Sequence, residues 1–277
     1  MMNVPLLEIH NLEITRKIQK SELSLIKGIN LKVARGEIVG LIGESGSGKS
    51  LTAKAILGLL PESVKVSEGS IMFKETNVLT QSKKQRYSLL GKQMAIISQD
   101  YRGSFTPYIK IGKQMVETIQ SHSSLSKKVA KQKAFDMLGH MDLPEERIYN
   151  SYPFQLSGGQ VQRAAVATIM ALQPSFIICD EVTTALDVIN GEKVMNYIDM
   201  IRRMTNCGVL MITHDLTQAF KRTDRLYVMS QGEIVEEGPT KEIRRLPTHA
   251  YTKSLYASLL PLPDKQRETS ARRVVDL

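Results

Sequence analysis

Gly43-Glu44-Ser45-Gly46-Ser47-Gly48-Lys49-Ser50 is the stretch that decides the fold of this 277-residue chain. Glycines let backbone N–H groups turn inward around phosphate oxygens, and a helix that begins here would point its positive end at the same anion. Lys49 can reach the β- and γ-phosphates of a nucleotide, and Ser50 can ligate Mg²⁺. The alternative, a glycine turn formed by chance, requires neither a strand before the loop nor a helix after it.

The residues on either side of the loop supply both elements. Glu37–Ile42 is a short apolar run that predicts a buried strand leading into the loop. Ser50–Leu60 has the apolar spacing of a helix, and Pro61 is expected to end it. We therefore predict a phosphate-binding loop over residues 43–51, in which Leu51 also contacts the nucleotide.

The first hundred residues contain further short apolar segments that predict strands. A polar stretch, Thr15–Glu22, is expected to separate the first two. The strands are expected at Leu6–Ile14, Leu25–Val33, Gly69–Phe73 and Met94–Ser98.

From Asp100 to about Tyr152 the chain is polar and predominantly helical in pattern, which predicts a helical subdomain inserted into an α/β core. Its clearest helices are expected at Lys113–Gln120 and Lys127–His140. From Ser157 onward, helices are expected at Gly158–Leu172, Gly191–Met204 and Asp215–Lys221, and strands at Phe176–Asp180, Gly208–Thr213, Leu226–Met229 and Glu233–Val235. Alternating strands and helices predict a mostly parallel sheet covered on both faces, with ligands at the carboxyl ends of its strands. From Pro247 a short basic appendage or tail is expected.

Two carboxylates end one of these strands, because Asp180 and Glu181 follow the apolar run Phe176–Cys179. Asp180 can bind Mg²⁺ through water, and Glu181 can act as the general base that polarises the attacking water. The alternative is an ordinary polar strand end, which is common where no phosphate loop is present.

A second anion site is predicted where Leu156-Ser157-Gly158-Gly159-Gln160 opens a helix. The phosphate loop, this segment and the Asp-Glu pair, in that order and at these separations, together resemble the nucleotide-binding domain of ABC transporters. The resemblance implies a P-loop NTPase of ABC type, an α/β fold with a mixed sheet core, an inserted helical subdomain and an N-terminal antiparallel β region. It implies an ATPase core formed by residues 1–98 and 157–240, a helical subdomain over 99–156 and a C-terminal extension and tail over 241–277.

The resemblance also implies roles for single residues. Gln99 stands at the Q-loop position, which contacts Mg²⁺ or the attacking water, so Ser50, Gln99 and Asp180 are the expected metal ligands. His214 resembles the histidine that contacts the γ-phosphate, and Asp187, in Ala185-Leu186-Asp187, belongs to the loop that crosses the dimer interface. Such domains work as head-to-tail pairs. Ser157, Gly158, Gly159 and Gln160 are therefore expected to act on the nucleotide of the partner.

Several segments are similar to the ATP-binding subunits of oligopeptide, dipeptide and nickel importers, and the short extension and small size favour the nickel type. They include Ile56–Pro61, Ser151–Gly159 and the C-terminal segment Pro247–Leu255. The sequence departs from that pattern at Tyr101, Val182 and Ala250, where prolines are usual. Arg16 stands where many members stack an aromatic ring on adenine, and arginine can also stack there. No cysteine follows Cys207, so the four-cysteine cluster of many peptide-type members is impossible. These departures would fit a chain that pairs with a different ATPase subunit, and a homodimer stays open as the alternative.

Composition and charge bear on whether the chain enters a membrane, is secreted or binds nucleic acid. No apolar run approaches the roughly 20 residues of a membrane-spanning helix, and the first ten residues lack the pattern of a secretory signal. The two cysteines, Cys179 and Cys207, indicate reduced buried thiols. The net charge of +9 is scattered, which favours a solvated basic surface.

The implied assembly contains ATP and Mg²⁺, a second ATPase subunit, two permease subunits and, indirectly, an extracellular substrate-binding protein, at the cytoplasmic face of the membrane. Two alternatives stay open. One is a soluble ABC ATPase acting on DNA or ribosomes, although no coiled coil, zinc module or second nucleotide domain is visible and no nucleic-acid partner is expected. The other is a regulatory subunit without catalysis, against which Lys49, Asp180, Glu181 and His214 argue.

Overall fold

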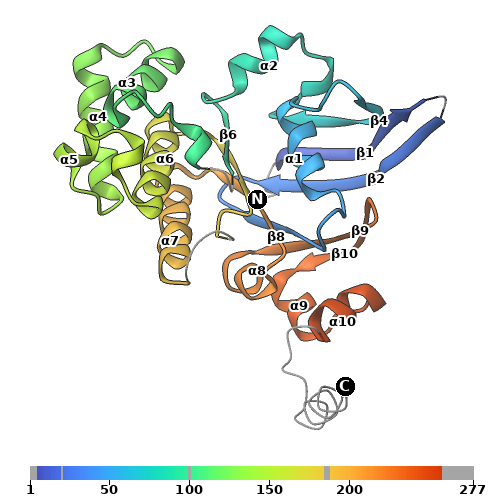
Figure 1. Ribbon diagram of the computed structural model, residues 1–277. Coiled ribbons are helices and arrows are strands. Elements are labelled where there is room, and N and C mark those ends of the chain that lie inside the picture. Colours follow the sequence, from blue (N-terminus) through green and yellow to red (C-terminus); the bar gives the residue numbers. More distant parts are fainter. Residues whose placement is uncertain (1–4, 20, 99–100, 184–187, 258–277) are drawn as a thin grey trace, which may run out of the picture.

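Two β-sheets and a group of helices make up the computed structural model, which describes residues 5–19, 21–98, 101–183 and 188–257 (Figure 1). The smaller sheet is antiparallel, with the strand order β2-β1-β4-β5. Its strands are β1 (Pro5–Ile18), β2 (Ser21–Ala34), β4 (Val64–Phe73) and β5 (Thr76–Asn77).

The larger sheet has the order β10-β9-β3-β8-β7-β6. Five neighbouring strands run parallel, and β10 pairs antiparallel with β9, so the predicted mixed sheet is confirmed. The strands are β3 (Ile38–Ile42), β6 (Met94–Ser98), β7 (Phe176–Asp180), β8 (Gly208–Thr213), β9 (Arg225–Ser230) and β10 (Glu233–Pro239). Every residue of β3 and β8 is buried, which explains why the two strands are apolar except for Thr213 at the end of β8.

Alternate residues of these strands enter two different cores. On one face, Ile178 and Leu210 join the core shared with the antiparallel sheet and with α1 (Lys49–Leu57). On the other face, Ile177 and Val209 join the core formed with the helices. The expectation of a sheet covered on both faces is confirmed, and both cysteines are buried free thiols, as expected.

The helices of the second core lie together on one side of the molecule (Figure 1). The helix α6 packs against both α3 and α4, so it ties the inserted helices to the sheet. These helices are α3 (Ile111–His122), α4 (Lys127–His140), α5 (Glu145–Asn150), α6 (Gly158–Leu172) and α7 (Val188–Thr205). The shorter helices are α2 (Lys83–Leu89), α8 (Leu216–Arg222), α9 (Thr240–Arg245), α10 (Ala250–Ala257) and the 3₁₀ turns Val78–Thr80, Arg102–Ser104 and Pro153–Gln155.

The structure corrects three expectations. The polar segment Thr15–Glu22 is not a separate connection, because Arg16 pairs with Leu23 and Lys17 with Glu22 in an extended hairpin. Backbone pairing needs no apolar side chains, and this end of the hairpin is largely exposed. The first helix ends at Leu57 rather than Leu60, because Gly58 adopts a left-handed cap with φ 68° before Pro61 is reached. The C-terminal appendage contains the ordered helix α10, and α2, α5 and α9 were not predicted.

Candidate functional site

The loop between β3 and α1 has the backbone that the glycine pattern predicts. Gly43 and Gly48 have φ values of 151° and 113°, a region that other residues rarely adopt. A Cβ atom at Gly43 would lie 2.1 Å from the Met229 carbonyl oxygen, and one at Gly48 would lie 2.5 Å from Ile26 Cδ1. Both positions therefore require glycine for conformation and for space.

Lys49 is buried and folds back over the loop that precedes it. Its Nζ atom donates hydrogen bonds of 2.7 Å to the carbonyl oxygens of both Gly43 and Glu44. Burial lowers the pKa of the ammonium group, and the nearby carboxylates of Glu181, Asp180 and Glu44 oppose this shift. The loop thus surrounds the Lys49 ammonium group, which lies where a polyphosphate would be bound.

Asp180 and Ser50 bring two oxygen atoms together at the carboxyl end of β7. The Ser50 hydroxyl donates a 3.1 Å hydrogen bond to Asp180 Oδ1. Burial raises the pKa of Asp180, while the hydrogen bond from Ser50 lowers it. Hard oxygen donors suit Mg²⁺, which commonly takes one or two protein ligands and completes its shell with phosphate oxygens and water. The two residues fit such an ion.

Glu181 adopts a left-handed backbone, with φ 51°, directly after the strand. Its N–H donates to the Ile212 carbonyl oxygen at 3.0 Å, and its Oε1 lies 3.2 Å from His214 Nδ1. Glu181 also lines a cavity of about 240 Å³ together with residues of the phosphate loop. The geometry joins a carboxylate that can accept a proton to an imidazole at the next strand end.

A residue that sequence reasoning missed holds the turn after Glu181. Gln162, in α6, is almost fully buried, and its Nε2 donates a 2.8 Å hydrogen bond to the Val182 carbonyl oxygen. A left-handed residue other than glycine costs about 1–3 kcal/mol and persists only where its surroundings fix it. The only sequence signal was a second glutamine after Gln160, which does not reveal its distant partner.

We expect Gln162→Met to lower the maximal rate of ATP hydrolysis by roughly tenfold with little change in the KM for ATP. Methionine fills a similar volume but leaves the buried Val182 carbonyl oxygen unpaired, a loss of about 1–3 kcal/mol that would loosen the Glu181 turn. Steady-state kinetics of the assembled ATPase measure both constants. Thr168→Val, which removes a side-chain hydrogen bond to Ala164 in the same helix, is the control. An unchanged rate for Gln162→Met would contradict this role.

The predicted second anion site begins α6. Ser157 Oγ accepts from the Gln160 N–H at 3.3 Å, and Gln160 Oε1 accepts from the Ser157 N–H at 3.1 Å, which forms a capping box. Ser157 is exposed, and Gly158 and Gly159 follow it in the first turn. Among the described residues, the phosphate-loop cavity is lined by none of these four. The two segments that were predicted to bind anions therefore do not line one cavity within the described part of the chain.

Three further predictions concern Gln99, the segment 185–187 and Arg16. Gln99 and the segment Ala185-Leu186-Asp187 lie outside the described residues. Arg16 is exposed in β1, opposite Leu23 and Val64, and it does not line the phosphate-loop cavity. Leu25 of the same hairpin does line it, which sequence reasoning did not foresee. Its apolar side chain offers a surface against which a flat base can pack.

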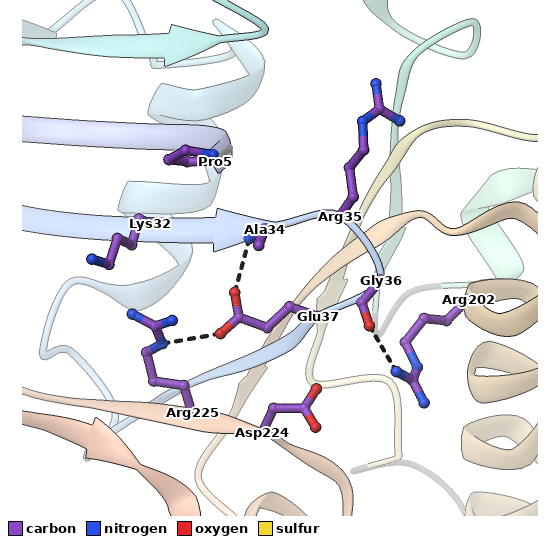
Figure 2. A pocket seen from close by; sticks show the side chains of 9 residues that line it. All are labelled: Pro5, Lys32, Ala34, Arg35, Gly36, Glu37, Arg202, Asp224 and Arg225. Atoms are coloured by element: carbon purple, nitrogen blue, oxygen red, sulfur yellow. Dashed lines mark hydrogen bonds and ion pairs between the residues drawn. The ribbon is translucent and has the colours of Figure 1, made fainter. Parts of the chain in front are cut away.

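A larger hollow of about 390 Å³ lies near the amino-terminal end of β3, opposite the end that carries the phosphate loop (Figure 2). There Glu37 accepts hydrogen bonds from the Ala34 N–H at 2.8 Å and from Arg225 Nε at 3.0 Å. Arg202 donates to the Gly36 carbonyl oxygen at 2.7 Å. The Glu37–Arg225 pair and the bond from Arg202 to the backbone join the ends of strands from both sheets, which gives these residues a structural role.

Comparisons with known proteins identify the family. A family model described as ABC transporter matches residues 26–184. The metal-staphylopine import system ATP-binding protein CntD of Staphylococcus aureus is 39% identical over 87% of this chain and 89% of its own length. The dipeptide transport ATP-binding protein DppD of Haemophilus influenzae is 36% identical over 98% of this chain and 82% of its own length.

Solved structures show the same fold. A dimeric bacterial ABC transporter cassette matches with a TM-score of 0.75 and 27% identity, over 84% of this chain and 98% of that one. A dimeric post-hydrolysis state of an ATP-binding cassette with ADP and Pi matches with a TM-score of 0.74 and 26% identity, over the same shares. Within the described residues, no helix has the length and apolar character needed to cross a membrane. This chain belongs to the ABC transporter family and is one of its ATPases.

Proposed function

We propose that this chain is the motor subunit of an importer for peptides or metal complexes, and that it hydrolyses ATP in a dimer to drive permease subunits. The observation that carries the proposal is the separation of two anion-binding segments, the phosphate loop and the start of α6. Each is half of a nucleotide site, and a head-to-tail pair would complete both. The relatives named for metal-staphylopine, dipeptide and oligopeptide transport support the class of cargo.

Within one site, each residue has a distinct task. Lys49 and the loop N–H groups bind the β- and γ-phosphates, and Glu181 accepts a proton from the attacking water. His214 orients Glu181 and contacts the γ-phosphate. Mg²⁺, when bound by Ser50, Asp180 and Gln99, would neutralise charge on the phosphate oxygens. Leu25 and Arg16 lie beside the adenine base of the nucleotide.

The partner chain contributes the other half. Ser157, Gly158, Gly159 and Gln160 would approach the γ-phosphate held by the partner, with Asp187 at the interface between them. Residues 1–98 and 157–240 form the ATPase core in this proposal, 99–156 the helical subdomain and 241–277 the extension. The second ATPase subunit can be identical or different, and the departures at Val182 and Tyr101 favour a different one.

An apolar hollow in the helical subdomain is the proposed docking site for the permease. It has a volume of about 410 Å³, and Phe105, Pro107, Phe154 and Leu156 are among the residues that line it. Phe154 is 68% exposed, which is unusual for a large aromatic side chain. The hollow adjoins the start of α6, so a permease segment bound here would move with the part that meets the nucleotide of the partner. This would place the chain at the cytoplasmic face of the membrane, with the extracellular binding protein reached only through the permease.

The test is co-purification from membranes of cells that express the chain with its candidate permease subunits. We expect two multi-span subunits to be retained, and Phe154→Asp to reduce their recovery by about tenfold or more, because a carboxylate in an apolar contact loses its hydration. Val129→Asp is the matched control, since Val129 is 49% exposed on α4 and outside the hollow. Retention of RNA or DNA in place of membrane subunits would overturn the proposal.

A further inference from the structure

The C-terminal extension reaches the phosphate loop. Tyr251, in α10, accepts a 2.9 Å hydrogen bond at its hydroxyl oxygen from the backbone N–H of Glu44, which is 207 residues away in the chain. Tyr251 also packs with Leu255 and Tyr256 against a core that contains Ile42, the residue just before the loop. The end of the described chain thus touches the segment that was expected to bind phosphate.

This contact falls on a peptide unit that Lys49 also holds. The carbonyl oxygen of Gly43 accepts from Lys49 Nζ at 2.7 Å, and the N–H of the same peptide unit, which belongs to Glu44, donates to Tyr251. One planar group is therefore fixed from both of its ends. A hydrogen bond at the N–H polarises the peptide and strengthens its carbonyl oxygen as an acceptor. Tyr251 thereby acts on the group that positions the Lys49 ammonium.

The extension is anchored independently of the loop. Glu236, in β10, accepts hydrogen bonds from the Thr248 N–H at 2.7 Å, from the Thr248 hydroxyl at 2.9 Å and from the His249 N–H at 3.2 Å. Burial raises the pKa of Glu236, but the hydrogen bonds from Thr248 and His249 help to outweigh it, and the pKa lies below its usual value. The carboxylate therefore fixes the start of α10 at neutral pH.

A second anchor holds the far end of α10. The Tyr256 hydroxyl donates to the Ile243 carbonyl oxygen at 2.9 Å, and the rings of Tyr256 and Phe220 lie 5.0 Å apart. Figure 1 shows α9 and α10 together beside α8. Because contacts outside the phosphate loop hold α10 at both ends, the helix keeps the Tyr251 hydroxyl in position beside the loop.

We propose that Tyr251 is a positioning residue of the nucleotide site, through which the C-terminal extension sets the affinity of the phosphate loop for the triphosphate. This rests on the proposed function only in that the loop binds ATP. The Tyr251 hydroxyl acts through the backbone N–H of Glu44. It orders the Gly43–Glu44 peptide before ATP arrives, which lowers the ordering cost of binding.

The test is Tyr251→Phe, which keeps the ring packing and removes only the hydroxyl. ATP affinity, measured by equilibrium titration of the purified full chain, is expected to fall about three- to tenfold, the effect of one ordinary hydrogen bond. In the assembled ATPase the KM for ATP should rise by a similar factor, with the rate at saturating ATP changed less than about twofold. Tyr197→Phe is the matched control, because it removes a 2.8 Å hydroxyl hydrogen bond to Asp142 from α7, outside both the C-terminal extension and the loop.

A double-mutant cycle separates positioning from general stability. If Tyr251 acts through the peptide that holds Lys49, then Tyr251→Phe should have little further effect on ATP affinity in a Lys49→Ala background. Full additivity, equal losses in Tyr251→Phe and Tyr197→Phe, or unchanged affinity in Tyr251→Phe would each overturn the proposal. Titration of the isolated chain does not involve permease subunits, so a failed importer assignment would leave this result interpretable.

Discussion

ATP turnover is expected to fall by a factor of about 10²–10⁴ in Glu181→Gln, while ATP binding is retained. Glutamine has the same shape as glutamate and can still form a hydrogen bond with His214, but its amide cannot accept a proton from water. The substitution leaves the backbone hydrogen bonds of this turn in place. The N–H of residue 181 still donates to the Ile212 carbonyl oxygen, and the Val182 carbonyl oxygen still accepts from the Gln162 side chain. The loss therefore falls on the chemical step. Phosphate release by the assembled ATPase measures turnover, and titration with nucleotide measures binding.

Glu192→Gln provides the control for removing a carboxylate. Glu192, in α7, pairs with Lys221 at 2.8 Å and with Arg222, and these contacts hold its pKa at about 2, away from the nucleotide site. Its replacement should lower stability but leave the turnover per folded molecule close to that of the unchanged chain. Near-normal turnover in Glu181→Gln would remove Glu181 from the role of general base.

Replacing Lys49 by alanine acts on binding itself. We expect ATP affinity to fall by a factor of about 10–10², because a charge-assisted hydrogen bond contributes about 1.5–3 kcal/mol. The carbonyl oxygens of Gly43 and Glu44 would also lose their shared donor, so the loop would be less ordered before binding. Equilibrium titration with ATP, monitored together with thermal unfolding, measures the change.

The control for this substitution is Lys54→Ala. Lys54 lies on the same helix, carries the same charge and is exposed. Removing it should change ATP affinity by less than about threefold, since screening weakens the influence of an exposed charge. If Lys49→Ala bound ATP as tightly as Lys54→Ala, the phosphate-loop assignment would fail.

The sequence predicted best where local signals and burial agree. The bounds of β6, β7 and β8 are as predicted, because each is a short apolar run buried in the sheet. The helix Lys127–His140 also begins where expected, after Ser126, whose side chain caps it. The structure brings the predicted site residues Lys49, Ser50, Asp180, Glu181 and His214 together, because the carboxyl ends of parallel strands share one edge.

The failures concern features that no local pattern encodes. The exposed end of the β1–β2 hairpin is stabilised by backbone pairing, so its polar side chains carried no strand signal. Leu25, Gln162 and Tyr251 reach the site from distant parts of the chain, and their partners become visible only after the fold brings them together. The C-terminal helix was missed because its anchors, such as Glu236, lie on another element.

The helix α6 has a consequence for how two catalytic events could be timed. Gln160 lies at the end that would meet a neighbouring nucleotide, and Gln162, about 3 Å further along the axis, steadies the turn beside this chain's own Glu181. If nucleotide bound at the Gln160 end shifted this helix as a rigid body, the shift would displace Glu181 in this chain's own site. Such coupling would make the two sites of a dimer hydrolyse ATP at different times. It would act over less than one helical turn.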